Sequence, residues 1–147
     1  MDRFSFKLKE SILAPKKVYT VDNGFITQVT GSNEMSRLIE NTVLVELLRR
    51  KSYFDKSIEI NYWKNERQAE VDFLLRKGKS VTSLIQVSYA NDKKEIKERE
   101  TKNLLSASKE LHCSNLLIIT WDYEAEERIK GRKIRFVPLW KWLLNPD

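Results

Sequence analysis

The stretch Ala69–Tyr89, AEVDFLLRKGKSVTSLIQVSY, decides the fold that the sequence predicts. Two short apolar runs flank a polar turn that contains Gly78, which is typical of a β-hairpin. Successive side chains of a strand point to opposite faces of a sheet. Strict alternation therefore places Asp72 on the face opposite Val71 and Phe73.

Polar residues inside this hairpin are its main chemical clue. Asp72 lies in the middle of the first strand, while Gln86 and Ser88 stand at positions i and i+2 of the second. A buried carboxylate needs a counter-charge, a metal ion or a proton to be tolerated. Asp72 and Gln86 could also form a hydrogen-bonded pair at a sheet edge without any metal.

Composition limits the class of protein. A chain of 147 residues with 41% hydrophobic residues can bury the core of one domain. The formal net charge of +6 suits an anionic partner. The single cysteine, Cys113, excludes an internal disulfide, and the single histidine, His112, gives little basis for a zinc site. Neither an 18-residue apolar run nor a signal-peptide core occurs, so we expect a cytoplasmic protein with no membrane partner.

The rest of the chain predicts a mixed α/β fold. Residues 1–17 form an N-terminal arm in which Pro15 interrupts any regular element, and the domain occupies residues 18–147. The predicted helices are 34–50, 93–111 and 138–144, and the predicted strands are 18–21, 57–63, the hairpin, 116–120 and 134–137. Residues 25–29 are expected as a further strand or a short helix, and residues 122–132 as a charged loop.

The order of these elements sets the expected topology. The strand at 57–63 and the two hairpin strands form an antiparallel meander. The strand at 116–120 is reached through a helix, so it lies parallel to the second hairpin strand after a right-handed crossover. A mixed central sheet flanked by helices is the predicted architecture.

This order, with its acids and its polar pair, resembles the PD-(D/E)XK restriction-endonuclease-like superfamily, whose core is αβββαβ. More narrowly, the segments IENTVLVELLRR, INYWKNERQAEVDFLL, LIQVSYANDKKEIKERETKNLLSAS, LLIITWD and IRFVPLWKWLL resemble the nuclease-like domain fused behind AAA+ ATPases in archaea and bacteria. The likeness runs from about Lys17 to the end of the chain. The sequence has no G-x-x-x-x-G-K-[ST] phosphate loop with which to bind nucleotide.

The resemblance implies phosphodiester hydrolysis assisted by Mg²⁺ or Mn²⁺, which offsets charge and acidifies a water. In that superfamily the first helix and two strands each supply an acid or its substitute, and a lysine two residues further on orients the attacking water. By position, the resemblance implies Glu40, Asp72, Gln86 and Ser88 as the catalytic positions, with Glu46 as a lesser candidate for the helix acid. Glu40, Asp72 and Gln86 would be the metal ligands.

Two positions depart from the superfamily pattern. Gln86 stands where the second acid belongs, and Ser88 stands where the lysine belongs. Glutamine keeps an oxygen ligand without the charge, whereas serine does not replace an ammonium electrostatically. A lysine from elsewhere could substitute, and the candidates are Lys79, Lys93, Lys94 and Lys97. These departures favour a cleavage-impaired module.

Three functions remain open at this stage. The first is a cleavage-impaired nuclease-fold module that acts with DNA or with a DNA-acting ATPase. The second is a working Mg²⁺-dependent DNA endonuclease, similar to Holliday-junction resolvases, with a relocated lysine. The third is a protein-interaction domain that regulates an AAA+ ATPase. The superfamily also suggests a homodimer, and the candidate nucleic-acid contacts are Lys64, Arg67, Lys77, Lys79 and Lys93.

Overall fold

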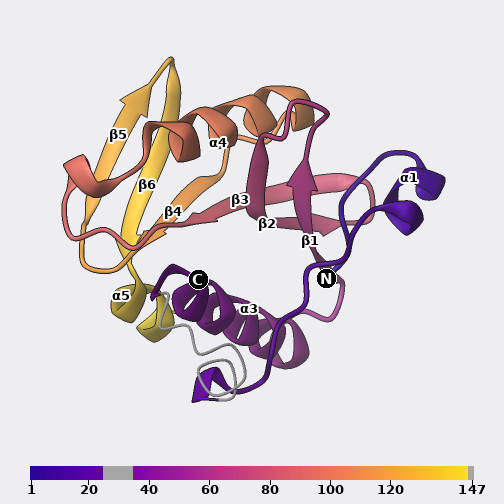
Figure 1. Cartoon of the computed structure of the whole chain (residues 1–147), viewed down its shortest axis with the longest axis horizontal. Coiled ribbons are helices and arrows are strands. Elements are labelled where there is room, and N and C mark those ends of the chain that lie inside the picture. The colour runs from indigo at the N-terminus through magenta and orange to yellow at the C-terminus, as the bar shows by residue number, and fades with distance from the viewer. Residues whose placement is uncertain (25–34, 146–147) are drawn as a thin grey trace.

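A computed structural model describes residues 1–24 and 35–145, which form one twisted sheet with helices on both faces (Figure 1). The elements are α1 (Leu8–Leu13), α3 (Met35–Tyr53), β1 (Ile58–Lys64), β2 (Glu70–Lys77), β3 (Ser80–Val87), the 3-10 helix η1 (Lys93–Glu95), α4 (Glu98–Leu111), β4 (Leu116–Thr120), β5 (Ala125–Ile129), β6 (Arg132–Pro138) and α5 (Leu139–Leu144).

Within the described residues, the sheet has six strands in the order β1-β2-β3-β4-β6-β5. Strands β1, β2 and β3 form an antiparallel meander, and α4 then carries the chain to β4, which lies parallel to β3. Strand β6 lies parallel to β4 and pairs antiparallel with β5 at the edge. This mixed sheet confirms the predicted fold class and is consistent with a restriction-endonuclease-like αβββαβ core.

The sheet separates two hydrophobic cores. Helix α4 packs on one face, where Leu104 and Ala107 meet Leu74 and Ile118. Helices α3 and α5 cover the other face, as Figure 1 shows below the sheet. Strand β4 is buried along its whole length, as its continuous apolar run predicts for an interior parallel strand.

A bulge in β2 overturns the strict alternation that the sequence predicts. Asn61 of β1 pairs with Leu74, and Trp63 of β1 pairs with Val71. Two residues along β1 therefore correspond to three residues along β2, so β2 carries one extra residue. Val71 and Leu74 consequently face the α4 core, while Phe73 faces the α3 core. A bulge of this kind changes the direction of the side chains at its centre, so simple alternation does not determine which way Asp72 points.

The predicted strand at 18–21 is wrong. Its backbone pairs with a side chain instead: Asn41 of α3 accepts from the Thr20 N–H at 2.9 Å and donates to the Thr20 carbonyl at 2.9 Å. A buried amide therefore takes the place of a neighbouring strand, because it offers the same donor and acceptor pair.

Replacing Asn41 with alanine is expected to lower the free energy of unfolding by about 2 kcal/mol, because it leaves both backbone groups of Thr20 without their partner. Urea unfolding measures the loss, and faster amide exchange at Thr20 localises it. Replacing the exposed Ser52 of the same helix is the matched control, with an expected change under about 0.5 kcal/mol. Unchanged exchange at Thr20 in the Asn41 variant would contradict the assignment.

Two other predicted elements differ from the structure. The charged loop predicted at 122–132 contains β5, whose alternating polar residues suit an edge strand. The helix predicted at 93–111 is broken, because Asp92 caps the short η1 and the backbone at Ile96 is extended before α4 begins. The element predicted at 25–29 lies outside the described residues.

The segment predicted as an arm lies along the free edge of β1 at the right of Figure 1. Phe4 N–H donates to the Tyr62 carbonyl at 2.7 Å, and Tyr62 N–H donates to the Asp2 carbonyl at 3.1 Å. Helix α1 ends at Leu13, before Pro15, and Lys17 pairs through its backbone with Met1. These contacts hold Lys17 beside the sheet. Within the described part of the chain, no helix is both long enough and apolar enough to cross a bilayer.

Candidate functional site

Asp72 is almost completely buried, with 8% of its surface exposed. Its Oδ2 accepts hydrogen bonds from Gln86 Nε2 at 2.5 Å and from the Val87 N–H at 3.0 Å. The register between β2 and β3 runs only as far as Phe73 opposite Ile85. The carboxylate therefore occupies the gap that opens between the two strands beyond that pair.

Lys17 brings three carboxylates together at this gap. Its Nζ lies 2.7 Å from Glu70 Oε1, 3.1 Å from Glu40 Oε1 and 3.3 Å from Asp72 Oδ1. Glu40 comes from α3 and the other two acids come from β2. We call Lys17, Glu40, Glu70 and Asp72 the Lys17 cluster. Its side chains are 12–30% exposed, so water screens these ion pairs less than those at the surface.

Two further side chains contact the acids of the Lys17 cluster. The Tyr19 hydroxyl donates to Glu40 Oε1 at 2.5 Å, and Lys64 Nζ lies 3.3 Å from Glu70 Oε2. Two ammonium groups thus face three carboxyl groups. The cluster and Lys64 carry one net negative charge if every group is ionised, and none if one carboxyl is protonated.

Asp72 is the acid placed to hold that proton. Burial raises its pKa from the ordinary 3.8 to about 7, and the nearby Glu40 charge adds to this rise, which Lys17 and the Val87 N–H only partly offset. Burial would lower the pKa of Lys17, but Asp72, Glu40 and Glu70 outweigh it and hold that pKa above its usual range. Burial, aided by Glu40, also raises the pKa of Tyr19. The site therefore fixes Lys17 as a cation and leaves Asp72 sensitive to pH near neutrality.

The structure brings Glu40, Asp72 and Gln86 together, as the resemblance implies. The Asp72–Gln86 hydrogen bond also matches the plainer alternative of an amide–carboxylate pair. Gln86 Oε1 is buried and has no hydrogen-bond partner among residues 1–24 and 35–145. Ser88 is buried at the end of β3, where its N–H donates to the Ile119 carbonyl. Glu46 lies apart from the cluster, bound to Arg49 and Arg50.

The lysine positions proposed from the sequence do not reach the cluster. Lys79 stands in the β2–β3 turn at the far end of the hairpin, and Lys93 pairs with Glu127 at 2.8 Å. Lys17 takes that place instead, from the segment that the sequence predicts as an arm. Its distance of 55 residues from Asp72 explains why spacing could not reveal it. The one local signal is Pro15, which extends the chain before Lys17.

The oxygen donors of the cluster are of the type that Mg²⁺ prefers, and the unpartnered Gln86 Oε1 would add one more. Their arrangement does not fit the ion. Each carboxylate already contacts Lys17 Nζ, and the part of the chain that the structure describes holds no group of three histidine, cysteine or acidic residues arranged for a metal. An ammonium and a divalent cation cannot share this space.

Residues 35–142 match a protein family described as "Domain of unknown function (DUF4143)". This match spans more than half of the chain. The chain belongs to the DUF4143 family. The match includes Glu40, Asp72, Gln86 and Ser88, whereas Lys17 and Tyr19 precede it.

This DUF4143 chain is also 34% identical, over 151 aligned positions, to a protein of Methanocaldococcus jannaschii named "Uncharacterized protein MJ1544". The alignment covers 99% of this chain and 32% of that protein. The chain therefore spans about a third of the length of this relative.

Among solved structures, the DUF4143 chain is similar to a chain in a half-complex from the tetradecameric assembly of Thermococcus gammatolerans McrB AAA+ hexamers with bound McrC. The sequence identity is 14%, the TM-score is 0.42, and the likeness covers 71% of this chain and 27% of the other.

Proposed function

We propose that this DUF4143 chain is a nuclease-fold module that has lost phosphodiester cleavage and acts in contact with DNA or with a DNA-acting partner. One observation carries the proposal. The ammonium of Lys17 lies within 3.3 Å of the carboxylates of Glu40, Glu70 and Asp72, where metal-dependent nucleases of this superfamily need a divalent cation.

The loss follows from the charge that the chemistry requires. A divalent cation offsets the charge that develops on the phosphate and lowers the pKa of a bound water. An ammonium ion offsets only one charge and has no site for a water ligand. Gln86 adds no negative charge that would favour the metal over Lys17, and Ser88 supplies no ammonium of its own.

The candidate DNA contacts lie at three places on the sheet. Lys64 ends β1 and Arg67 lies in the β1–β2 turn, at the end of β2 that holds the Lys17 cluster, whereas Lys93 pairs with Glu127 of the edge strand β5. Lys77 and Lys79 lie at the opposite end of the β2–β3 hairpin, where Lys77 pairs with Asp55. We expect DNA at the cluster end, with Arg67, which is exposed, as the strongest contact.

A second candidate function rests on the same lysine. Lys17 Nζ is 3.3 Å from Asp72 Oδ1, within reach of the place where a relocated lysine would orient an attacking water. In this alternative the chain is a Mg²⁺- or Mn²⁺-dependent endonuclease, and Lys17 moves off the carboxylates when the ion binds.

A cleavage assay with the whole chain separates the two candidates. We expect no cut of linear, branched or supercoiled DNA in about 10 mM Mg²⁺ or Mn²⁺, a concentration high enough to fill a weak carboxylate site. The same samples should retain DNA at low salt, and retention should fall steeply as salt rises, because phosphate contacts release counterions. Metal-dependent cleavage that Lys17→Met abolishes would establish the second candidate and overturn the first.

The variant Arg67→Gln tests the DNA contact separately. It should weaken retention and reduce its salt dependence by about one phosphate contact, whereas Lys79→Gln, at the far end of the hairpin, should change neither. If the chain neither cuts nor retains DNA, direct contact with DNA is contradicted. The remaining alternative from the sequence resemblance, an interaction domain of an AAA+ ATPase, would then be favoured.

A further inference from the structure

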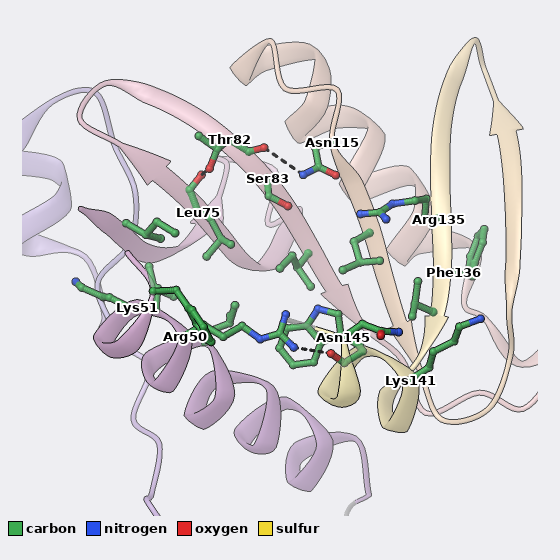
Figure 2. A pocket seen from close by; sticks show the side chains of 18 of the residues that line it. Arg50, Lys51, Leu75, Thr82, Ser83, Asn115, Arg135, Phe136, Lys141 and Asn145 are labelled. Carbon is green, nitrogen blue, oxygen red and sulfur yellow. Dashed lines mark hydrogen bonds between the residues drawn. The ribbon is translucent and has the colours of Figure 1, made fainter. Parts of the chain in front are cut away.

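A cleft of about 640 Å³ lies between the sheet and the two helices that cover it from below (Figure 2), and no member of the Lys17 cluster is among the residues that line it. Helix α3 contributes Leu47, Arg50 and Lys51 to the lining and α5 contributes Lys141 and Trp142, and the two helices are joined where Arg50 donates to the Trp142 carbonyl. Apolar side chains make the floor, among them Ile58, Leu75, Ile85, Leu117 and Val137. A cavity of this size and lining is typical of small-molecule sites.

A polar group stands at one mouth of the cleft. Ser83 is 8% exposed, and its hydroxyl points into the cleft beside the amide of Asn115 (Figure 2). No hydrogen bond of this hydroxyl occurs within the described residues. Arg135 lies on β6 opposite Leu117 and extends its guanidinium over β4 toward the same mouth. The Ser83 hydroxyl and the exposed Arg135 guanidinium face the same mouth, where both can donate hydrogen bonds to a bound acceptor.

The charges around the cleft favour an anion. The acids that line it are each paired: Asp55 with Lys77, Glu124 with Lys141, and Glu126 with Lys133. Arg135 and Lys51, on opposite sides of the cleft, have no ion pair among residues 1–24 and 35–145. The unbalanced charge is therefore positive.

We propose that this cleft binds an aliphatic carboxylate, whose head group accepts from Arg135, Ser83 and Asn115 and whose chain lies on the apolar floor toward Trp142. The guanidinium offers two parallel N–H groups, which match the two oxygens of a carboxylate. The aliphatic side chains of the floor suit a hydrocarbon chain, and Phe54 and Trp142 add apolar surface to the lining. A free fatty acid and the C-terminal residue of a polypeptide share this chemistry.

Titration of the chain with octanoate tests the proposal, with heteronuclear NMR as the readout. Octanoate should shift the amide resonances of Ser83, Leu117 and Arg135 in a saturable way, whereas octanol should bind at least roughly tenfold more weakly, because it lacks the charge. The dipeptide acetyl-Leu-Leu, with a free or an amidated C-terminus, distinguishes the peptide source: preference for its free form over octanoate assigns the site to a polypeptide terminus.

Two variants keep the test independent of folding. Arg135→Gln changes an exposed residue and should weaken octanoate about tenfold, while Lys109→Gln, on α4 across the sheet, should leave its affinity unchanged. Ser83→Leu should fill the mouth and abolish the shifts. Equal affinity of octanoate for the original chain and the Arg135 variant, equal binding of octanol, or the absence of saturable shifts would each overturn the proposal.

Discussion

Replacing Lys17 with methionine is expected to lower the free energy of unfolding by about 2–4 kcal/mol at pH 8. Removing one partner of a buried ion pair costs roughly 3–5 kcal/mol, and the partial exposure of these side chains reduces that figure. Methionine keeps the length and apolar stem of lysine, so the loss reports the ammonium rather than a cavity. Urea denaturation at fixed ionic strength measures the change.

Lys16 provides the matched control for this variant. It is the neighbouring residue, and its Nζ lies 3.3 Å from Asp2 Oδ1 at the protein surface, where both side chains are more than half exposed. Replacing Lys16 with methionine should change stability by less than about 1 kcal/mol. Equal losses for the two variants would show that Lys17 is an ordinary surface lysine.

Replacing Asp72 with asparagine is expected to change how stability depends on pH. The pKa of Asp72 is about 7 in the folded chain, mainly because burial disfavours its charged form, against 3.8 for an exposed aspartate. A raised acid pKa means that the folded state binds the proton more tightly. The stability that Asp72 contributes is therefore fully present below about pH 4 and is lost as the pH rises through 7.

The expected size of this loss is up to about 4 kcal/mol, since the pKa of Asp72 rises from 3.8 to about 7 on folding. The pKa of Glu70 is lowered, so its contribution to stability changes with pH in the opposite direction. The quantity to compare is therefore the difference in free energy of unfolding between the Asp72 variant and the original chain at each pH. The free energy of unfolding of the Asp72→Asn variant should rise steadily, relative to that of the original chain, from pH 4 to pH 8. Asp55→Asn supplies the contrast, because Lys77 holds the pKa of Asp55 at about 2 and its contribution is lost only in acid. A stability difference between the Asp72 variant and the original chain that stays constant across this range would contradict the raised pKa.

The sequence predicts the sheet well where burial is strong. The continuous run at Leu116–Thr120 and the hairpin with its Gly78 turn lie as expected, because hydrophobic periodicity reflects burial directly. Strand β5 could not be found in this way, since a solvated edge strand carries as many charges as a loop. The bulge at Asp72 was equally hidden, because it depends on the pairing with β1 and not on β2 alone.

Only part of the candidate site could be predicted from the sequence. Glu40, Asp72 and Gln86 lie on regular elements whose order matches a known superfamily, so the resemblance could carry them over. Lys17 and Tyr19 lie in an extended segment that is held by Asn41 and by the edge of β1. Contacts between distant segments leave no periodic signal, and the position of Lys17 becomes visible only in three dimensions.

We propose that the Lys17 ammonium occupies the place of a divalent cation. Thermal unfolding in rising Mn²⁺ is the decisive measurement, with the original chain compared with Lys17→Met and the Lys16→Met control. Mn²⁺ is expected to raise the melting temperature of the Lys17 variant alone, since a ligand at about a hundred times its Kd adds about 2.7 kcal/mol to the free energy of unfolding. Specific stabilisation of the original chain by Mn²⁺, equal to or greater than that of the Lys17 variant, would contradict it.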